Sequence, residues 1–409
     1  MNIARLFLVV CAGVSCVQAF SGGAAAQSGA APPASTAPPP AVAPPPTPLE
    51  FRTALLNAAN DLFSKAQVNG EKLVLVIDPL IDGVTGAQSN ATQLEQRMIA
   101  QLVQEKYPRF QLTRFSADAL ARAPVVLIGT FTAINNAGVA GGPRDAYRIC
   151  LALADMKTRT IVSKGVARAL PEGIDATPTS FFADSPVFAK DAAIDSYIKS
   201  CQGTKVGDNI DQAYADRILV ASMTNDAIEA YNAGRYREAL DTYHGVMKVP
   251  GGEQLRTLNG IYLANVRLRR TKAALQSFGD VIDYGLKGDK LAVKFLFRPS
   301  STQFASQWRY RATYDSWLHV IAERTAAKRG CLEVVGHTSS TGLAALNDRL
   351  STLRAEYIKD RLEDEQPALR RRLISSGRGS REMLVATGKD DASDALDRRV
   401  ELKTVQCAG

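Results

Sequence analysis

Residues 331–357 read CLEVVGHTSSTGLAALNDRLSTLRAEY, and this stretch decides the fold of the C-terminal part of the chain. Residues 332–335 (LEVV) are mostly apolar and indicate a strand, and residues 336–342 are rich in turn-forming side chains. Residues 343–363 then carry apolar side chains at helical spacing, namely Leu346, Leu350, Leu353 and Tyr357. The pattern predicts a strand, a loop and a long helix whose apolar stripe packs inward, beside a polar edge of Asn347, Ser351 and Arg354.

The residues on either side continue this alternation of strands and helices. The sequence predicts strands at 292–297, 373–376 and 399–405, and a further helix at 310–328. Together with the strand and helix above, these elements make a C-terminal α/β domain over residues 291–409.

Three blocks of this domain resemble the peptidoglycan-binding C-terminal domain of OmpA-family proteins. They are residues 336–342 (GHTSSTG), residues 346–355 (LNDRLSTLRA) and residues 397–401 (DRRVE). The resemblance implies a βαβαββ fold that binds the peptidoglycan stem peptide, typically of the diaminopimelate type, without a covalent bond. It also implies roles for four residues: Arg354 holds a stem carboxylate, Thr338 and Asn347 shape the site, and Arg399 supports it from the last strand.

Ser339 departs from the family pattern, in which the loop usually reads GHTD and the aspartate faces the ligand ammonium group. A serine hydroxyl accepts a hydrogen bond but lacks the charge that makes such bonds roughly twice as strong. We therefore expect binding to be weaker than in an aspartate-bearing relative by roughly 1 to 3 kcal/mol. A domain that keeps the fold and has lost the ligand remains the alternative.

Residues 206–290 read as helical and repetitive. The stretch 225–243, NDAIEAYNAGRYREALDTY, resembles a tetratricopeptide (TPR) repeat, and Ala274 and Phe278 stand 35 residues after Ala239 and Tyr243. Small residues let paired helices approach and aromatic residues fill the gap between them. The region is either a groove that binds proteins or a spacer between domains.

Residues 50–205 alternate helical and extended patterns and end in a predicted hairpin of residues 147–153 and 160–168. Strand-helix-strand crossovers followed by a hairpin predict a mixed sheet, so this is an N-terminal α/β domain. The order of elements resembles the α/β domains of TolB-type N-termini and of the lipoprotein activators of cell-wall synthases. The whole chain is thus expected to be a multi-domain α/β and α+β protein with an all-α TPR-like middle region.

Residues 1–26 have the pattern of a signal peptide, with Arg5, an apolar run from Leu6 and small residues at the exit. An uncleaved N-terminal anchor is the alternative. Residues 27–49 follow as a linker with nine prolines between Ala31 and Leu49 and no charge in that stretch, which favours an extended polyproline II spacer. The sequence therefore predicts an exported protein of the periplasm or outer membrane.

Four cysteines follow the signal peptide: Cys150, Cys201, Cys331 and Cys407. An even number in an exported chain predicts two disulfide bonds. Four cysteines allow three connectivities, and we favour the pairs nearest in sequence because each falls within one predicted domain. Four separate buried thiols are the alternative.

The sequence gives no support for catalysis, for a cofactor or for nucleic-acid binding. Its three histidines lack metal-ligand spacing, and neither a GxSxG nor an HExxH motif occurs. Arginines do gather after the long helix, where an anionic wall polymer or a solvated surface would suit them: Arg370, Arg371, Arg372, Arg378 and Arg381. No aromatic residues alternate with these arginines, which argues against nucleic acid as a partner.

These observations predict a non-catalytic cell-envelope protein that binds peptidoglycan through residues 291–409 and presents its other modules to envelope proteins. The competing hypothesis is an assembly or regulatory scaffold whose C-terminal domain no longer binds peptidoglycan.

Overall fold

The computed structural model describes residues 47–140, 144–188, 191–288, 290–295, 297–298, 300–304, 311–328, 330–385, 388, 394 and 396–407. The predicted signal peptide and the linker up to residue 46 lie outside the described residues. Residues 45–409 form one compact unit, and every element below belongs to it. No helix in the described ranges has the length and apolar character needed to span a bilayer.

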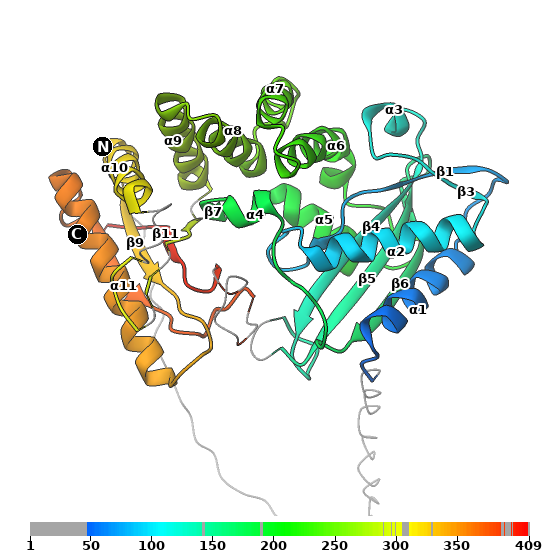
Figure 1. Cartoon of the computed structure of the whole chain (residues 1–409), viewed down its shortest axis with the longest axis horizontal. Helices are drawn as coiled ribbons and strands as arrows, with labels where there is room; N and C mark the ends of the chain where they lie inside the picture. The colour runs from blue at the N-terminus through cyan, green and yellow to red at the C-terminus, as the bar shows by residue number, and fades with distance from the viewer. Residues whose placement is uncertain are drawn as a thin grey trace, which may run out of the picture. The chain divides into compact units, whose positions relative to one another are not determined.

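The first sheet has the mixed topology that the sequence predicts, in the order β3-β1-β4-β5-β6 with β2 beside β4 (Figure 1). Strands β3, β1 and β4 are parallel, and β4, β5 and β6 are antiparallel. Its elements are α1 (Phe51–Ser64), β1 (Leu73–Ile77), β2 (Ile81–Asp82), α2 (Asn90–Lys106), β3 (Phe110–Leu112), α3 (Ala117–Leu120), β4 (Val125–Ile134), β5 (Ala146–Asp155) and β6 (Thr160–Ala169).

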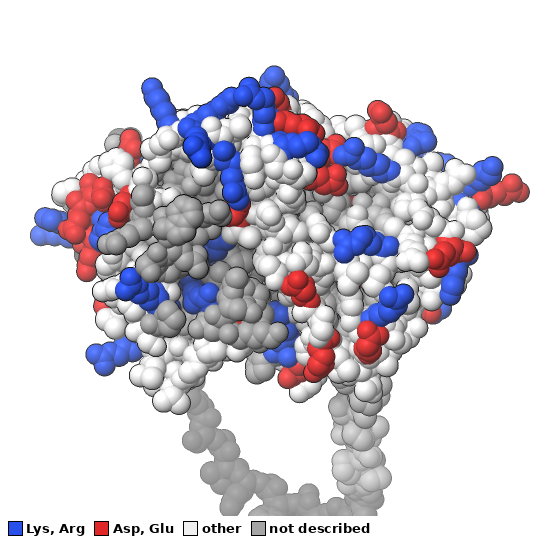
Figure 2. Space-filling view, in the orientation of Figure 1, with Lys and Arg blue, Asp and Glu red and all other residues white. Residues whose placement is uncertain are grey.

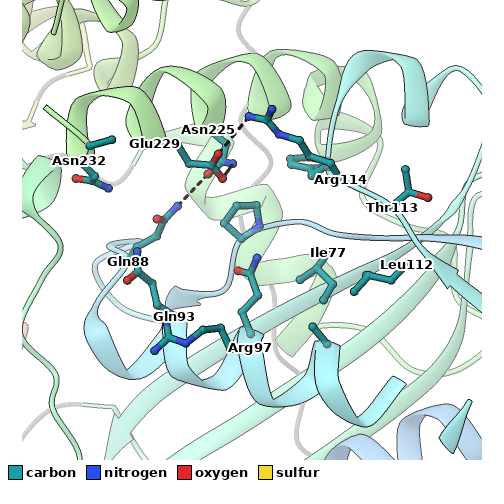
Figure 3. A pocket seen from close by; sticks show the side chains of 15 residues that line it. Ile77, Gln88, Gln93, Arg97, Leu112, Thr113, Arg114, Asn225, Glu229 and Asn232 are labelled. Atoms are coloured by element: carbon teal, nitrogen blue, oxygen red, sulfur yellow. Dashed lines mark hydrogen bonds and ion pairs between the residues drawn. The ribbon is translucent and has the colours of Figure 1, made fainter. Parts of the chain in front are cut away.

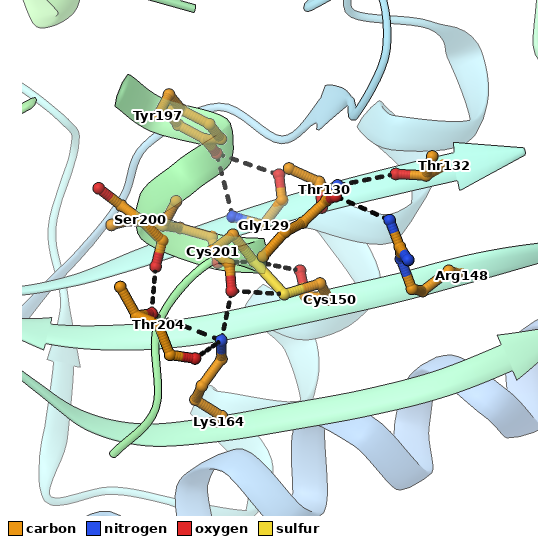
Figure 4. Close-up of a disulfide and its surroundings, with 12 residues drawn as sticks. Gly129, Thr130, Thr132, Arg148, Cys150, Lys164, Tyr197, Ser200, Cys201 and Thr204 are labelled. Atoms are coloured by element: carbon orange, nitrogen blue, oxygen red, sulfur yellow. Dashed lines mark hydrogen bonds between the residues drawn. A yellow bond between two sulfur atoms is a disulfide. The ribbon is translucent and has the colours of Figure 1, made fainter. Parts of the chain in front are cut away.

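Both faces of this sheet are covered, which explains why β4 and β5 are apolar along most of their length. Helices α1 and α2 pack on one face. Helix α5 (Ala192–Gln202) and the first half of α6 (Gln212–Asn232) pack on the other. A disulfide bond between Cys150 and Cys201 ties β5 to the end of α5 (Figure 4).

The middle region consists of four helices, which pack as the pairs α6 with α7 (Tyr236–Val246) and α8 (Leu255–Arg267) with α9 (Thr271–Lys287). The predicted packing residues Ala239, Tyr243 and Phe278 are fully buried. Gly260 of α8 faces the Tyr243 ring so closely that a Cβ atom there would lie 2.1 Å from it. Small and aromatic residues therefore do space these helices, as the sequence pattern predicts.

The second sheet has the order β10-β9-β11-β8-β7. Its elements are β7 (Val187–Phe188), β8 (Lys290–Val293), α10 (Arg311–Ala327), β9 (Cys331–Gly336), α11 (Ala344–Glu365), a 3-10 turn (Pro367–Leu369), β10 (Leu373–Gly377) and β11 (Val400–Val405). Strand β10 runs parallel to β9, and β11 is antiparallel to both β9 and β8. A second disulfide bond joins Cys331, which opens β9, to Cys407, which follows β11.

One edge of the second sheet comes from an unexpected part of the chain. Strand β7, which follows the short helix α4 (Ser180–Asp184), pairs antiparallel with β8. It therefore belongs to the C-terminal sheet, although the sequence analysis places it within residues 50–205. Two residues are too few to show a strand period, so only the tertiary pairing identifies this edge.

Candidate binding site in the C-terminal domain

The long helix α11 turns its polar edge inward, which corrects the predicted orientation. Asn347, Ser351 and Arg354 are buried, whereas Leu346 is 62% and Leu353 is 40% exposed. The reason is a close approach: a Cβ atom on Gly336 of β9 would lie 2.1 Å from the Ser351 carbonyl oxygen. Only small side chains fit at this contact, so Leu346 and Leu353 occupy the outer face, whereas Leu350 and Tyr357 of the predicted stripe are half-buried.

The loop after β9 brings three of the predicted site residues together. The Asn347 Nδ2 donates to the carbonyl oxygens of Thr341 (3.0 Å) and Ser339 (3.4 Å), which fixes the loop on the first turn of α11. The Ser339 hydroxyl lies 3.4 Å from the Thr341 hydroxyl. The Thr338 Oγ1 is buried and has no hydrogen-bond partner among the described residues. The loop thus holds a buried hydroxyl that still lacks a partner.

Arg354 is 3% exposed and is held by a segment that precedes α10. Its Nε and NH2 groups donate to the carbonyl oxygens of Ser301 and Arg298, both at 3.2 Å. Its guanidinium lies over the Phe297 ring, 4.8 Å from the ring centroid. The guanidinium is therefore held in place, and part of its donor capacity is directed at the protein itself.

Arg399 is also buried and forms an internal ion pair with Glu401. Its Nε and NH2 groups donate to the Glu401 Oε1 at 2.9 and 2.8 Å, and NH1 donates to the Glu382 carbonyl oxygen at 3.0 Å. Arg399 therefore acts as an internal support. The sequence carried a signal for this pair, because residues two apart on a strand point to the same face.

His337 packs beside the same ion pair, with its Nε2 3.8 Å from the Glu401 Oε2. Burial lowers the pKa of His337, so the ring is neutral at pH 7. Burial alone would raise the pKa of Glu401, but His337 and Arg399 hold it below the usual range. The carboxylate therefore stays ionised.

His337, Glu382 and Glu401 place ligand atoms within 4.8 Å of one another, the spacing of a possible metal site. Two cations already neutralise these carboxylates, since Arg399 binds Glu401 and the Lys403 Nζ lies 3.3 Å from the Glu401 Oε2. An added divalent cation would meet this positive charge, so we assign no metal here.

The arginine cluster predicted after α11 is largely engaged within the domain. Arg372 donates to the carbonyl oxygens of Gly330, Ala326 and Thr325, and Arg381 pairs with Asp348. A basic surface instead lies over the helices of the middle region (Figure 2). Exposed cations flank the turns between α6 and α7 and between α8 and α9: Arg235, Arg237, Arg269, Arg270 and Lys272.

Residues 296–397 match the sequence model of the OmpA family, so the C-terminal part of the chain carries an OmpA family domain. The matched residues include Thr338, Ser339, Asn347 and Arg354, whereas Arg399 lies just beyond them. The match does not reach the N-terminal α/β domain or the helix pairs, whose likeness to TolB-type and TPR modules stays a prediction. No match was found among curated proteins.

Solved structures also resemble a limited part of the chain. An outer membrane protein from Borrelia burgdorferi B31 is 24% identical, and the alignment covers 29% of this chain and 88% of that one, with a TM-score of 0.23. The cell wall anchor of the T6SS from Pseudomonas aeruginosa is 26% identical, covering 29% and 81%, with a TM-score of 0.24. The peptidoglycan-associated lipoprotein from Burkholderia pseudomallei is 24% identical, covering 28% and 89%, with a TM-score of 0.22.

Proposed function

We propose that the protein is an exported, non-catalytic adaptor of the cell envelope whose OmpA family domain binds peptidoglycan noncovalently. Its ligand is the stem peptide, of the diaminopimelate type, and its location is the periplasm at the outer membrane. The observation that carries the proposal is the family match over residues 296–397, which contains the loop at Thr338 and the guanidinium of Arg354.

The local geometry supports this function in two ways. The guanidinium of Arg354 is fixed by the Phe297 ring and two carbonyl oxygens, so little side-chain entropy remains to be lost on binding a carboxylate. The Thr338 hydroxyl is buried without a partner among the described residues, and a ligand group at the loop would satisfy it.

A specific observation favours the second candidate, a scaffold without affinity for the wall. Arg354 is almost fully buried and donates to its own chain, and Ser339 stands where the family has an acid. If the protein is such a scaffold, Arg354 has only a structural role: its hydrogen bonds hold the segment around Arg298 and Ser301 against α11. The N-terminal and middle modules would then carry the function alone.

Sedimentation with purified sacculi separates the two candidates. We expect the exported protein to co-sediment and a soluble diaminopimelate-containing tripeptide to compete for binding. Arg354→Ala should lower retention at least ten-fold, because a charge-assisted hydrogen bond contributes about 1.5 to 3 kcal/mol. Arg349→Ala is the matched control, since Arg349 is an exposed arginine on the same helix.

A thermal melt must accompany each variant, because Arg354 also has a structural role. Arg354→Lys keeps the charge and loses the fixed fork, so it should fold and still bind less well. No retention of the wild type, or competition-resistant retention, would exclude stem-peptide binding and leave the scaffold.

A further inference from the structure

A cavity of about 750 Å³ lies between α2 and α6, at the carboxyl ends of β1 and β3 (Figure 3). Strand β1 lies between β3 and β4 in the sheet, and the cavity lies on the β3 side of it. In open α/β sheets, ligands bind outside the carboxyl ends of the strands. The volume is also within the range of ligand pockets.

Side-chain amides line both walls of this α2/α6 groove. The cavity is lined by Gln93 and Gln96 of α2 and by Asn225 and Asn232 of α6. The side chains of Gln93 and Gln96 make no hydrogen bond to any described residue and are partly exposed. On the α6 wall, Asn225 already bonds to Gln88 and Glu229, and the Asn232 Oδ1 accepts from the Phe181 N–H. The amides of Gln93 and Gln96 can both donate and accept, which matches the alternating N–H and C=O groups of an extended backbone.

The groove also carries one cation that is available to a ligand. Arg97 is exposed and forms no ion pair with any described residue. Arg114, in contrast, is paired with Asp226 (2.7 Å) and Glu229 (3.2 Å) of α6. The charge at Arg97 is therefore complementary to a carboxylate on the occupant.

The remaining lining residues favour a peptide over a saccharide. Ile77, Leu112 and Ala100 give an apolar floor that can accept side chains. Phe115 is the single aromatic residue that lines the cavity, and it is only 5% exposed. The described lining thus offers no ring face on which a sugar could stack.

We propose that the α2/α6 groove binds an extended peptide segment of a partner protein that carries at least one acidic side chain. This inference rests on the adaptor function proposed above and names the surface that the adaptor presents. It does not depend on peptidoglycan, because the groove and the OmpA family domain share no residue.

A phage-displayed library of random dodecapeptides, selected against the immobilised exported protein, tests the inference. We expect enriched peptides to share an Asp or Glu and to bind as synthetic peptides in fluorescence anisotropy. Arg97→Glu should weaken their binding at least ten-fold, and Lys106→Glu, a charge reversal at an exposed site of the same helix, should change it less than two-fold. Ala100→Trp should abolish binding by filling the floor.

Three results would overturn the inference. They are no enrichment, enriched peptides that bind Ala100→Trp as well as the wild type, and binding of N-acetylglucosamine tetramers in place of peptides. Circular dichroism must show that each variant is folded. Sacculus retention is measured in parallel, since loss of retention with intact peptide binding contradicts only the wall-binding proposal.

Discussion

The C-terminal domain and the α2/α6 groove present their arginines in opposite ways. In the C-terminal domain, Arg354 and Arg399 are 3% and 2% exposed and donate to carbonyl oxygens or to Glu401. In the groove, Arg97 is exposed and has no ion-pair partner among the described residues. A recognisable motif therefore marks a framework of buried contacts, whereas an open polar surface can arise without any motif.

The largest loss of stability should come from breaking the buried ion pair between Arg399 and Glu401 in the C-terminal domain. Arg399→Ala leaves the Glu401 carboxylate buried without its main partner, and we expect a loss of about 3 to 5 kcal/mol in the free energy of unfolding. Urea denaturation at pH 7 measures it. The pKa of Glu401 is lower in the folded than in the unfolded protein, so its ionised carboxylate stabilises the fold. This contribution is fully present at a pH above the unfolded-state pKa near 4.5 and is lost as the pH falls through the folded-state pKa.

The double variant Arg399→Met, Glu401→Leu is the control for this experiment. It removes both charges together, so it should be more stable than Arg399→Ala. If Arg399→Ala unfolds at the same urea concentration as the wild type, the buried pair does not hold this domain together.

On the groove side of the comparison, α2 buries a carboxyl group that lacks a hydrogen-bond partner among the described residues. Glu95 is fully buried, and neither carboxylate oxygen has a hydrogen-bond partner among the described residues. Burial raises its pKa to about 8. Because the pKa of Glu95 is higher in the folded than in the unfolded protein, the neutral carboxyl group favours folding at low pH. The free energy of unfolding is therefore highest below the unfolded-state pKa near 4.5 and falls as the pH rises to 8. Glu95→Met should therefore stabilise the protein at pH 8, by on the order of 3 kcal/mol more than at pH 4.

Thermal melts of the wild type and Glu95→Met across this pH range give the difference directly. Asp78, whose pKa burial raises to about 7, titrates in both proteins and cancels in the difference. The side chain of Gln101 is exposed on the same helix, so Gln101→Met serves as the control. A gain from Glu95→Met that does not vary with pH would show that the carboxyl group is not neutral in the folded protein.

Local patterns predicted the element order of the C-terminal domain and the mixed N-terminal sheet. Apolar runs, turn residues and strand-helix alternation are properties of neighbouring residues, so a single sequence carries them. The cysteine pairs 150 with 201 and 331 with 407, favoured because each lies within one predicted domain, are the pairs present in the structure.

What the sequence did not reveal depends on contacts between distant segments. Arg354 donates to the carbonyl oxygens of Arg298 and Ser301, which lie 56 and 53 residues earlier in the chain. Every residue has a backbone carbonyl group, so the side chains at these positions do not indicate the contact. Leu346 and Leu353 of α11 face outward because Gly336 lets the Ser351 backbone approach β9, and side-chain periodicity does not predict this contact. The α2/α6 groove is assembled from residues 77 to 233, so no short motif describes it.

A smaller change in affinity is expected from adding a carboxylate to the OmpA family site, where it can bind the ammonium group of the ligand. Ser339→Asp restores the acid expected by the family pattern, and it should strengthen binding of the diaminopimelate-containing tripeptide by roughly 1 to 2 kcal/mol. Isothermal titration calorimetry measures this change. Ser340→Asp adds the same charge one residue away and should leave the affinity within two-fold. Equal affinities of Ser339→Asp and wild type would argue that the ligand ammonium does not lie at residue 339.

The smallest effect is expected for Arg114→Ala at the rim of the groove. Its ion pair to Asp226 is 2.7 Å long, as short as the 2.8 Å pair of Arg399, but the Arg114 side chain is 68% exposed. Exposed pairs contribute about 0.2 to 1 kcal/mol, and 1 M salt screens them. We therefore expect the free energy of unfolding to fall by less than about 1 kcal/mol in low salt and to be unchanged in high salt. A loss as large as that of Arg399→Ala would mean that burial is not what separates the two regions, since the pair distances are alike and the solvent exposure differs.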